Sequence, residues 1–181
     1  RPRALVNASG VGYYGPRGEE VVTEGERPGT DFLAEVCRAW EDEAERATPL
    51  GVRVVRARIG VVLGEGGGAL EKLVLPFKLF VGGPIGSGEQ YVPWVHLDDA
   101  VGMFLHALDH ESVRGAMNVS APEPLKFRDL AAVLGRVLHR PSWLRVPGFA
   151  VRAAAGELAY ALLTGQRAVP RVAQDTGYHF T

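Results

Sequence analysis

The chain has 181 residues, of which 46% are hydrophobic and 23% charged, and its formal net charge is −1. This composition is typical of a globular protein with a sizeable core, and the balanced charge favours neither nucleic acid nor a membrane as a partner. The single cysteine, Cys37, excludes an internal disulfide and suits a reducing compartment, so we expect a cytoplasmic location. The sequence also shows no metal-ligand spacing, signal peptide or membrane-spanning apolar run.

The first predicted element is a buried strand over residues 3–8, which opens into a glycine-rich turn. That turn carries the hydroxyl groups of Ser9, Tyr13 and Tyr14. Ligands of open α/β sheets bind beyond the carboxyl ends of the strands, and glycines allow the backbone to approach a ligand closely. The turn therefore indicates either a ligand site or a plain tight turn with a capped serine and two packing tyrosines.

A polar loop follows over residues 15–29, which predicts either a lid over the sheet or a solvated excursion. Residues 31–47 are predicted to form a helix capped by Thr30 or Asp31, with Glu41 and the other acidic residues facing water. Its inward stripe is predicted to hold Leu33, Val36, Cys37, Trp40, Ala44 and Ala47. A second strand over residues 53–63 completes a strand–helix–strand unit, which favours a parallel pair with a right-handed crossover.

The later elements continue to alternate. Strands or extended segments are predicted over residues 91–96, where Pro93 favours an edge position, and over 116–120 and 143–146. Helices are predicted over residues 69–81 with a break at Pro76, and over 98–107, 127–138, 149–163 and 170–176. The helix at 98–107 is predicted to be capped by Asp98 or Asp99 and to bury Ala100, Val101, Phe104, Leu105 and Leu108. This alternation indicates the α/β class.

Several stretches in this order resemble the epimerase-like, atypical branch of the extended short-chain dehydrogenases/reductases. They are residues 7–15 (NASGVGYYG), 31–41 (DFLAEVCRAWE), 58–64 (RIGVVLG), 86–99 (GSGEQYVPWVHLDD) and 117–122 (MNVSAP). The resemblance implies the later part of a Rossmann-type parallel sheet with helices, plus a small α+β carboxy-terminal substrate lobe. Residues 1–64, with a return strand near 91–120, would be the later half of the NAD(P)-binding domain, and residues 65–181 mostly the lobe. Because no G-x-G-x-x-G motif joins a strand to a helix, we expect a longer parent protein.

The resemblance also implies a chemistry, namely hydride transfer between a nicotinamide and a substrate carbon. In that family a serine and a tyrosine polarise the substrate oxygen, and a lysine follows the tyrosine by four residues. Ser9 matches the serine, but a register anchored on Glu41 places Leu33 at the tyrosine and Cys37 at the lysine. Neither side chain can replace its counterpart. Two interpretations stay open: Tyr13 or Tyr14 transfers the proton beside Ser9, with Tyr13 the better candidate, or the protein binds NADP with little or no redox chemistry.

The remaining site residues follow from the same resemblance. Ala8, Ser9, Arg58, Ile59 and Gly60 match segments that contact the cofactor in relatives, although Arg58 also fits a strand-end charge paired with an acid. The substrate pocket is predicted to include Tyr14, Gln90, Trp94 and His96, although a histidine in an apolar strand is also typical of a hydrogen-bonded core residue.

A phosphate-clamping arginine of sugar-nucleotide enzymes corresponds to Val92, which makes a nucleotide-sugar substrate unexpected. We therefore expect an NAD(P)-binding, epimerase-like oxidoreductase or isomerase with NADP or NAD as cofactor and a small, non-nucleotide substrate. The alternatives are a non-catalytic NADP-binding or sensor protein, and a plain α/β protein with no cofactor. Beyond the substrate we expect no nucleic-acid or membrane partner, with a homodimer as one option.

Overall fold

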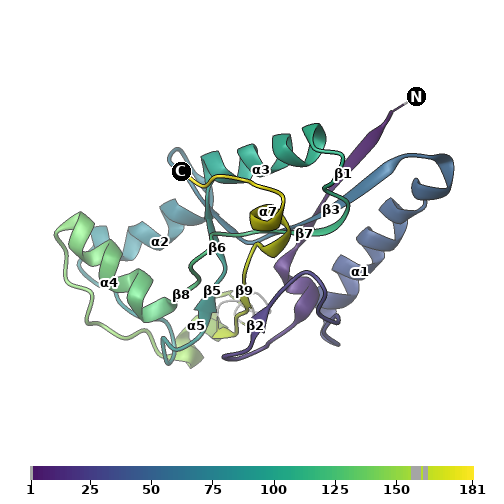
Figure 1. The fold of residues 1–181 in the computed structure, drawn as a ribbon. Coiled ribbons are helices and arrows are strands. Elements are labelled where there is room, and N and C mark those ends of the chain that lie inside the picture. The colour runs from purple at the N-terminus through teal and green to yellow at the C-terminus, as the bar shows by residue number, and fades with distance from the viewer. Residues whose placement is uncertain (1, 156–159, 161–162) are drawn as a thin grey trace.

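The fold is built around a parallel three-stranded sheet with the strand order β1-β3-β7. The computed structural model describes residues 2–155, 160 and 163–181 (Figure 1). The three strands are β1 (Ala4–Gly10), β3 (Arg53–Ile59) and β7 (Gly115–Val119). The predicted α/β class with a parallel sheet is confirmed.

Two helices cover opposite faces of this sheet, α1 (Phe32–Glu45) and α3 (Leu97–Asp109) (Figure 1). Successive side chains of a strand point to opposite faces, so alternate residues of β3 serve the two helices. Val55 and Ala57 pack with α3, whereas Arg56 and Arg58 reach Glu41 of α1. The core on the α3 side is apolar and consists of Val55, Ala57, Val95, Ala100, Met103, Ala107, Val113, Met117, Val119 and Ala173.

Short strand pairs surround the central sheet. β4 (Val61–Leu63) runs parallel to β6 (Trp94–His96), and β5 (Tyr91–Val92) runs antiparallel to β8 (Leu125–Lys126). β2 (Val21–Val22) runs parallel to β9 (Arg167–Ala168). The predicted strand over 53–63 is divided at Gly60 into β3 and β4, and the one over 91–96 is divided at Pro93 into β5 and β6, because proline donates no hydrogen bond to a ladder.

The other helices are α2 (Gly68–Lys78), α4 (Phe127–Leu138), α5 (Gly148–Ala155) and α7 (Arg171–Asp175), and the short 3-10 helices are η1 (Val11–Tyr14) and η2 (Thr48–Leu50). A second apolar cluster joins α2, α4, β5 and their neighbours, with Phe77, Val92, Phe127, Leu130 and Ala131 buried. Part of the predicted helix over 149–163 lies outside the described residues. Every helix in the described part of the chain is too short or too polar to cross a bilayer.

The predicted inward faces of two helices are wrong in part. In α1, capped by the Asp31 carboxylate, Cys37 and Ala44 are buried as predicted, but Trp40 is 55% exposed and Glu41 is 2% exposed. In α3, Ala100 is buried, whereas Val101, Leu105 and Leu108 are exposed. The side chain that caps α3 is His96, which accepts a hydrogen bond from the Asp98 amide, so the predicted aspartate cap is also wrong.

Candidate functional site

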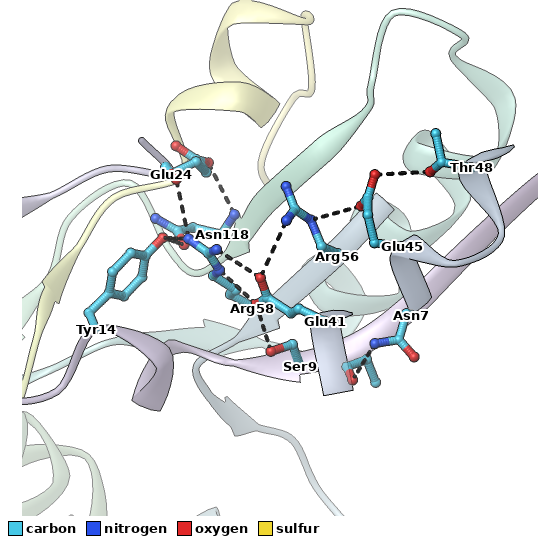
Figure 2. Close-up of polar contacts among 11 residues, drawn as sticks. Asn7, Ser9, Tyr14, Glu24, Glu41, Glu45, Thr48, Arg56, Arg58 and Asn118 are labelled. Carbon is cyan, nitrogen blue, oxygen red and sulfur yellow. Dashed lines mark hydrogen bonds and ion pairs between the residues drawn. The ribbon is translucent and has the colours of Figure 1, made fainter. Parts of the chain in front are cut away.

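A row of polar residues crosses the central sheet where its strands end. Ser9 on β1 is the register partner of Arg58 on β3, and Arg58 is the register partner of Asn118 on β7. Residues in one register row of a sheet point to the same face, here the face that α1 covers. Figure 2 shows their side chains gathered with those of Tyr14, Glu24 and Glu41. All three residues of the row are buried.

Glu41 of α1 is the acceptor at one end of this row. Its Oε1 accepts from Ser9 Oγ at 2.9 Å and from Arg58 Nε at 2.8 Å, and its Oε2 accepts from Arg58 Nη2 at 2.8 Å (Figure 2). This is a two-point pairing of guanidinium and carboxylate, the strongest geometry for such a pair. Burial opposes the charge of Arg58, but its hydrogen bonds with Glu41 and Tyr14 raise its pKa above the ordinary value. Arg58 is therefore a permanently charged partner of Glu41, as one sequence interpretation predicted.

Tyr14 and Asn118 occupy the other end. The Tyr14 hydroxyl accepts from Arg58 Nη1 at 2.9 Å and donates to Asn118 Oδ1 at 2.6 Å. Burial raises the pKa of Tyr14 to about 12, so this phenol stays neutral at physiological pH. The Tyr13 ring lies against the guanidinium instead, with Arg58 Cζ 3.4 Å from its centroid, a cation–π contact.

Glu24 ties the loop at residues 15–29 to the carboxy-terminal segment. Its Oε1 accepts from the backbone amides of Asn118 at 3.0 Å and Val172 at 3.1 Å. Burial raises the pKa of Glu24, although these amides favour the charged form. The β2–β9 pair and a hydrogen bond from Gln166 to the Gly15 carbonyl fasten the same loop. The loop is thus bonded to the body of the protein at several points.

A cavity of about 440 Å³ lies beside this network. Val11, Gly12, Ile59 and Gly60, which border it, follow or end β1 and β3, so it lies at the carboxyl ends of these strands. The other described lining residues come from α1 and its N-cap, α2, the β4–β5 region, α4, residue 160 and residues 164–166. They are Asp31, Leu33, Val61, Ala69, Lys72, Leu73, Ile85, Gln90, Tyr91, Val92, Pro93, Phe127, Tyr160, Thr164, Gly165 and Gln166. This position is the one in which open α/β sheets bind ligands.

The predicted site residues are divided between the network and the cavity. Ile59, Gly60 and Gln90 line the cavity, whereas Ser9, Tyr14 and Arg58 belong to the buried network and Tyr13 packs on it. The rest lie elsewhere: Ala8 is exposed on β1, Trp94 Nε1 donates to the Glu123 carbonyl, and His96 caps α3.

Sequence reasoning missed Glu41, Glu24 and Asn118 as members of the network. Glu41 follows Cys37 by four residues and precedes Ala44 by three, so helical spacing places all three on one face. That signal was present in the sequence, but the charge of Glu41 argued for solvent. Glu24 sits in a loop, and no local pattern indicates its contacts with Asn118 and Val172.

The fold can now be compared with solved structures. The structure of human epimerase family protein SDR39U1 (isoform 2) with NADPH superimposes with a TM-score of 0.91 at 37% identity, covering 99% of this chain and 61% of that one. Thermus thermophilus UDP-glucose 4-epimerase, solved with NAD, gives a TM-score of 0.74 at 18% identity, which shows a shared fold alone. The fold is therefore that of the extended short-chain dehydrogenases/reductases.

Sequence comparisons define the family more narrowly. The chain is 47% identical over 180 residues to the chloroplastic epimerase family protein SDR39U1 homolog of Arabidopsis thaliana, covering 99% of this chain and 52% of that protein. It is 41% identical over 182 residues to epimerase family protein YfhF of Bacillus subtilis (strain 168), covering 100% and 60%. Residues 146–181 match a family model described as a domain of unknown function, DUF1731. The chain is thus similar to epimerase family proteins over nearly its whole length, as the resemblance predicted, and spans about half to three fifths of the relatives' length.

Proposed function

We propose that the protein is an NADPH-binding, epimerase-like oxidoreductase or isomerase whose substrate is a small molecule without a nucleotide. The observation that carries this proposal is the cavity at the carboxyl ends of β1 and β3, bordered by Gly12 and Gly60. The human relative solved with NADPH shares this fold at 37% identity. We further propose that the central sheet belongs to the cofactor domain and that α2, α4 and α5 belong to the substrate lobe.

The residues at the strand ends fit the nicotinamide end of such a cofactor. Val11, Leu33 and Ile59 give this end of the cavity apolar walls that suit a flat ring. Glycine is required at position 60, because a Cβ atom there would lie 1.9 Å from the Pro93 carbonyl oxygen. The backbone of Gly60 is thereby held close to Pro93 while its other side remains open to the cavity. When bound, the cofactor supplies or accepts the hydride.

The chain's own residues restrict the choice of proton donor. Leu33 lines the cavity where relatives of the wider family are expected to carry tyrosine, and burial raises the pKa of Cys37, so its thiol stays protonated. Tyr14 is held by Arg58 and Asn118 deep in the network. Tyr13 is half-buried; its side chain makes ring contacts with Tyr14 and Arg58, and no described residue is hydrogen-bonded to its hydroxyl. We propose Tyr13 as the acid, with Ser9 as a neighbouring hydroxyl donor.

A second function is favoured by the hydrogen bond of Ser9. Its hydroxyl donates to Glu41 Oε1 inside the protein, and a hydroxyl has a single proton to donate. In that arrangement Ser9 cannot also polarise a substrate oxygen. The alternative proposal is therefore a protein that binds NADPH and a small ligand without chemical turnover.

The two functions are separated by cofactor binding and turnover in the full-length protein. NADPH binding is followed by fluorescence, and small ketones are screened for oxidation of NADPH. For the enzyme, we expect Ser9→Ala and Tyr13→Phe to lower the rate at least tenfold, about 1.4 kcal/mol of barrier, with unchanged NADPH affinity. The exposed Ser112→Ala variant serves as the control. NADPH binding without turnover in any variant supports the second function, and absence of NADPH binding overturns both.

A further inference from the structure

Among the described residues that line the cavity, one carries a positive charge, and no described residue pairs with it. Apart from Asp31 and Lys72, the lining side chains are uncharged, and most of them are apolar. Ala69, Lys72 and Leu73 come from one face of α2, which contributes apolar contacts together with the ammonium group. No hydrogen bond or ion pair joins Lys72 to any residue that the structure describes.

The charge of Asp31 is already balanced, in contrast to that of Lys72. The Asp31 carboxylate caps α1, where its Oδ1 accepts from the Ala34 amide at 2.9 Å. A carboxylate at this position is stabilised both by the hydrogen bond and by the positive end of the helix dipole. The two basic residues near Tyr91 are also engaged, because Lys126 pairs with Glu19 and Glu89, and Arg167 lies 5.2 Å from the centroid of the Tyr91 ring. Of the described residues that line the cavity, Lys72 is therefore the cation available to a ligand.

We propose that this cavity binds a small molecule with an apolar body and a single anionic group, and that Lys72 binds that group. This inference rests on the proposed function, which makes the cavity the substrate site. A volume of about 440 Å³ lies within the range of small-molecule sites, in which mainly apolar walls supply contact area and a few polar groups fix orientation. The ligand class is a carboxylate or sulfonate of an aromatic or aliphatic compound.

The same arrangement disfavours the diphosphate group of a nucleoside diphosphate. Such a group needs several donors, usually including an arginine that binds two oxygens at once. Here one flexible ammonium group shares the cavity lining with apolar side chains such as Val92, Ile85 and Phe127. Lys72 would thus determine specificity by pairing with one charge while the apolar walls accept the rest of the molecule.

The test compares two ligands that differ only in charge, 1-naphthylacetate and its uncharged amide. Their affinities are measured by calorimetry in the full-length protein, with and without saturating NADPH. We expect Lys72→Met to weaken binding of the acid about fivefold or more and to leave the amide unchanged, since a single partly exposed ion pair contributes about 1 kcal/mol. Lys72→Arg should retain the preference for the acid. Lys78→Met, on the same helix but outside the cavity lining, is the matched control.

The outcomes separate this inference from the proposed function. Equal weakening of both ligands by Lys72→Met, unchanged binding of the acid, or no binding of either ligand to the wild-type protein overturns the anionic-ligand proposal. NADPH affinity is measured in the same samples. If Lys72→Met weakens binding of the acid alone and the protein does not bind NADPH, the proposed cofactor is wrong and the proposed anionic-ligand site is supported.

Discussion

Ser9 and Arg58 are register partners on β1 and β3, and both donate to the same oxygen atom, Glu41 Oε1. The shared acceptor joins two strands to α1 through a single carboxylate. Since Arg58 also reaches the Tyr14 hydroxyl and the Glu24 carbonyl, its guanidinium connects the sheet, α1, η1 and the loop at residues 15–29. The resulting network lies beside the cavity proposed to hold the nicotinamide.

Removal of the Glu41 carboxylate should be strongly destabilising. Glu41→Leu leaves the guanidinium of Arg58 buried without its acid, which costs about 3–5 kcal/mol of unfolding free energy. The double variant Glu41→Leu/Arg58→Met removes both charges, so we expect it to recover more than about 1 kcal/mol of that loss. Urea unfolding measures all these free energies.

A surface acid on the same helix provides the control for Glu41. Glu43 pairs with Arg46 at 3.0 Å, but both side chains are largely exposed, so Glu43→Leu should change stability by less than about 1 kcal/mol. Equal effects of the Glu41 and Glu43 substitutions would contradict a special role of the buried pair.

The two neighbouring tyrosines should respond differently to loss of their hydroxyl groups. Tyr14→Phe removes a hydroxyl that accepts from Arg58 and donates to Asn118, and leaves a buried amide oxygen without its donor, a cost of about 1–3 kcal/mol. Tyr13→Phe keeps the ring on Arg58 and should alter stability by no more than about 0.5 kcal/mol. The check is to measure the thermal stability and the turnover rate of both variants. A lower rate in Tyr13→Phe at unchanged stability would support Tyr13 as the catalytic acid.

Gly60→Ala should disturb the junction between β3 and β4. The added Cβ would lie 1.9 Å from the Pro93 carbonyl oxygen, and the backbone must shift to relieve the contact. We expect a loss of about 1–3 kcal/mol, as for other overpacked sites, together with weaker NADPH binding. Gly25→Ala is the control, because no atom lies within 4 Å of its added Cβ. A Gly60→Ala protein with wild-type stability and cofactor affinity would rule out the tight junction.

We expect the folding stability to fall at acidic pH, in part because of His106 on α3. Burial and the adjacent His110 lower the pKa of His106 from its ordinary value of 6.5. The Thr176 hydroxyl donates to the Val172 carbonyl at 2.7 Å, so it accepts from the Nε2–H group of His106. Below pH 6.5 the unfolded chain binds more protons than the folded one, so stability falls with pH until the folded-state pKa is passed.

The measurement for His106 is the melting temperature as a function of pH. His106→Gln should show a smaller loss of melting temperature than wild type as the pH is lowered below 6.5. His179→Gln, at an exposed position near the carboxy-terminus, should keep the wild-type slope. Parallel slopes for wild type and His106→Gln would show that another group causes the acid sensitivity.

Much of this architecture could be predicted because its signals are local. The apolar run of β3 and the helical periods of α1 and α4 depend on neighbouring residues and were predicted closely, whereas the strands predicted over 53–63 and 91–96 are each divided in two in the structure. The order of strand, helix and strand then favoured the parallel pair of β1 and β3 that the structure shows. The resemblance to a family added the identity of the fold.

The buried network could not be predicted in the same way. Glu41 has helical spacing that places it inward, but a carboxylate is buried only when a partner such as Arg58 is brought to it by the tertiary fold. The two-residue strands β2 and β9 lie far apart in sequence and are too short to show a period. Val101 and Leu105 on α3 are exposed, but they were predicted to be buried. The prediction gave more weight to their hydrophobicity than to the side of the helix on which their spacing places them.

The carboxylate of Glu24 has a consequence for how the protein is made. Its two amide donors follow it in the chain by 94 and 148 residues. During synthesis, residues 15–29 leave the ribosome long before Val172 is translated, so the second of these hydrogen bonds must wait for that residue. This segment is accordingly protected only after Val172 has been made, and nascent chains arrested before Val172 should be cleaved there by a protease that spares the finished protein.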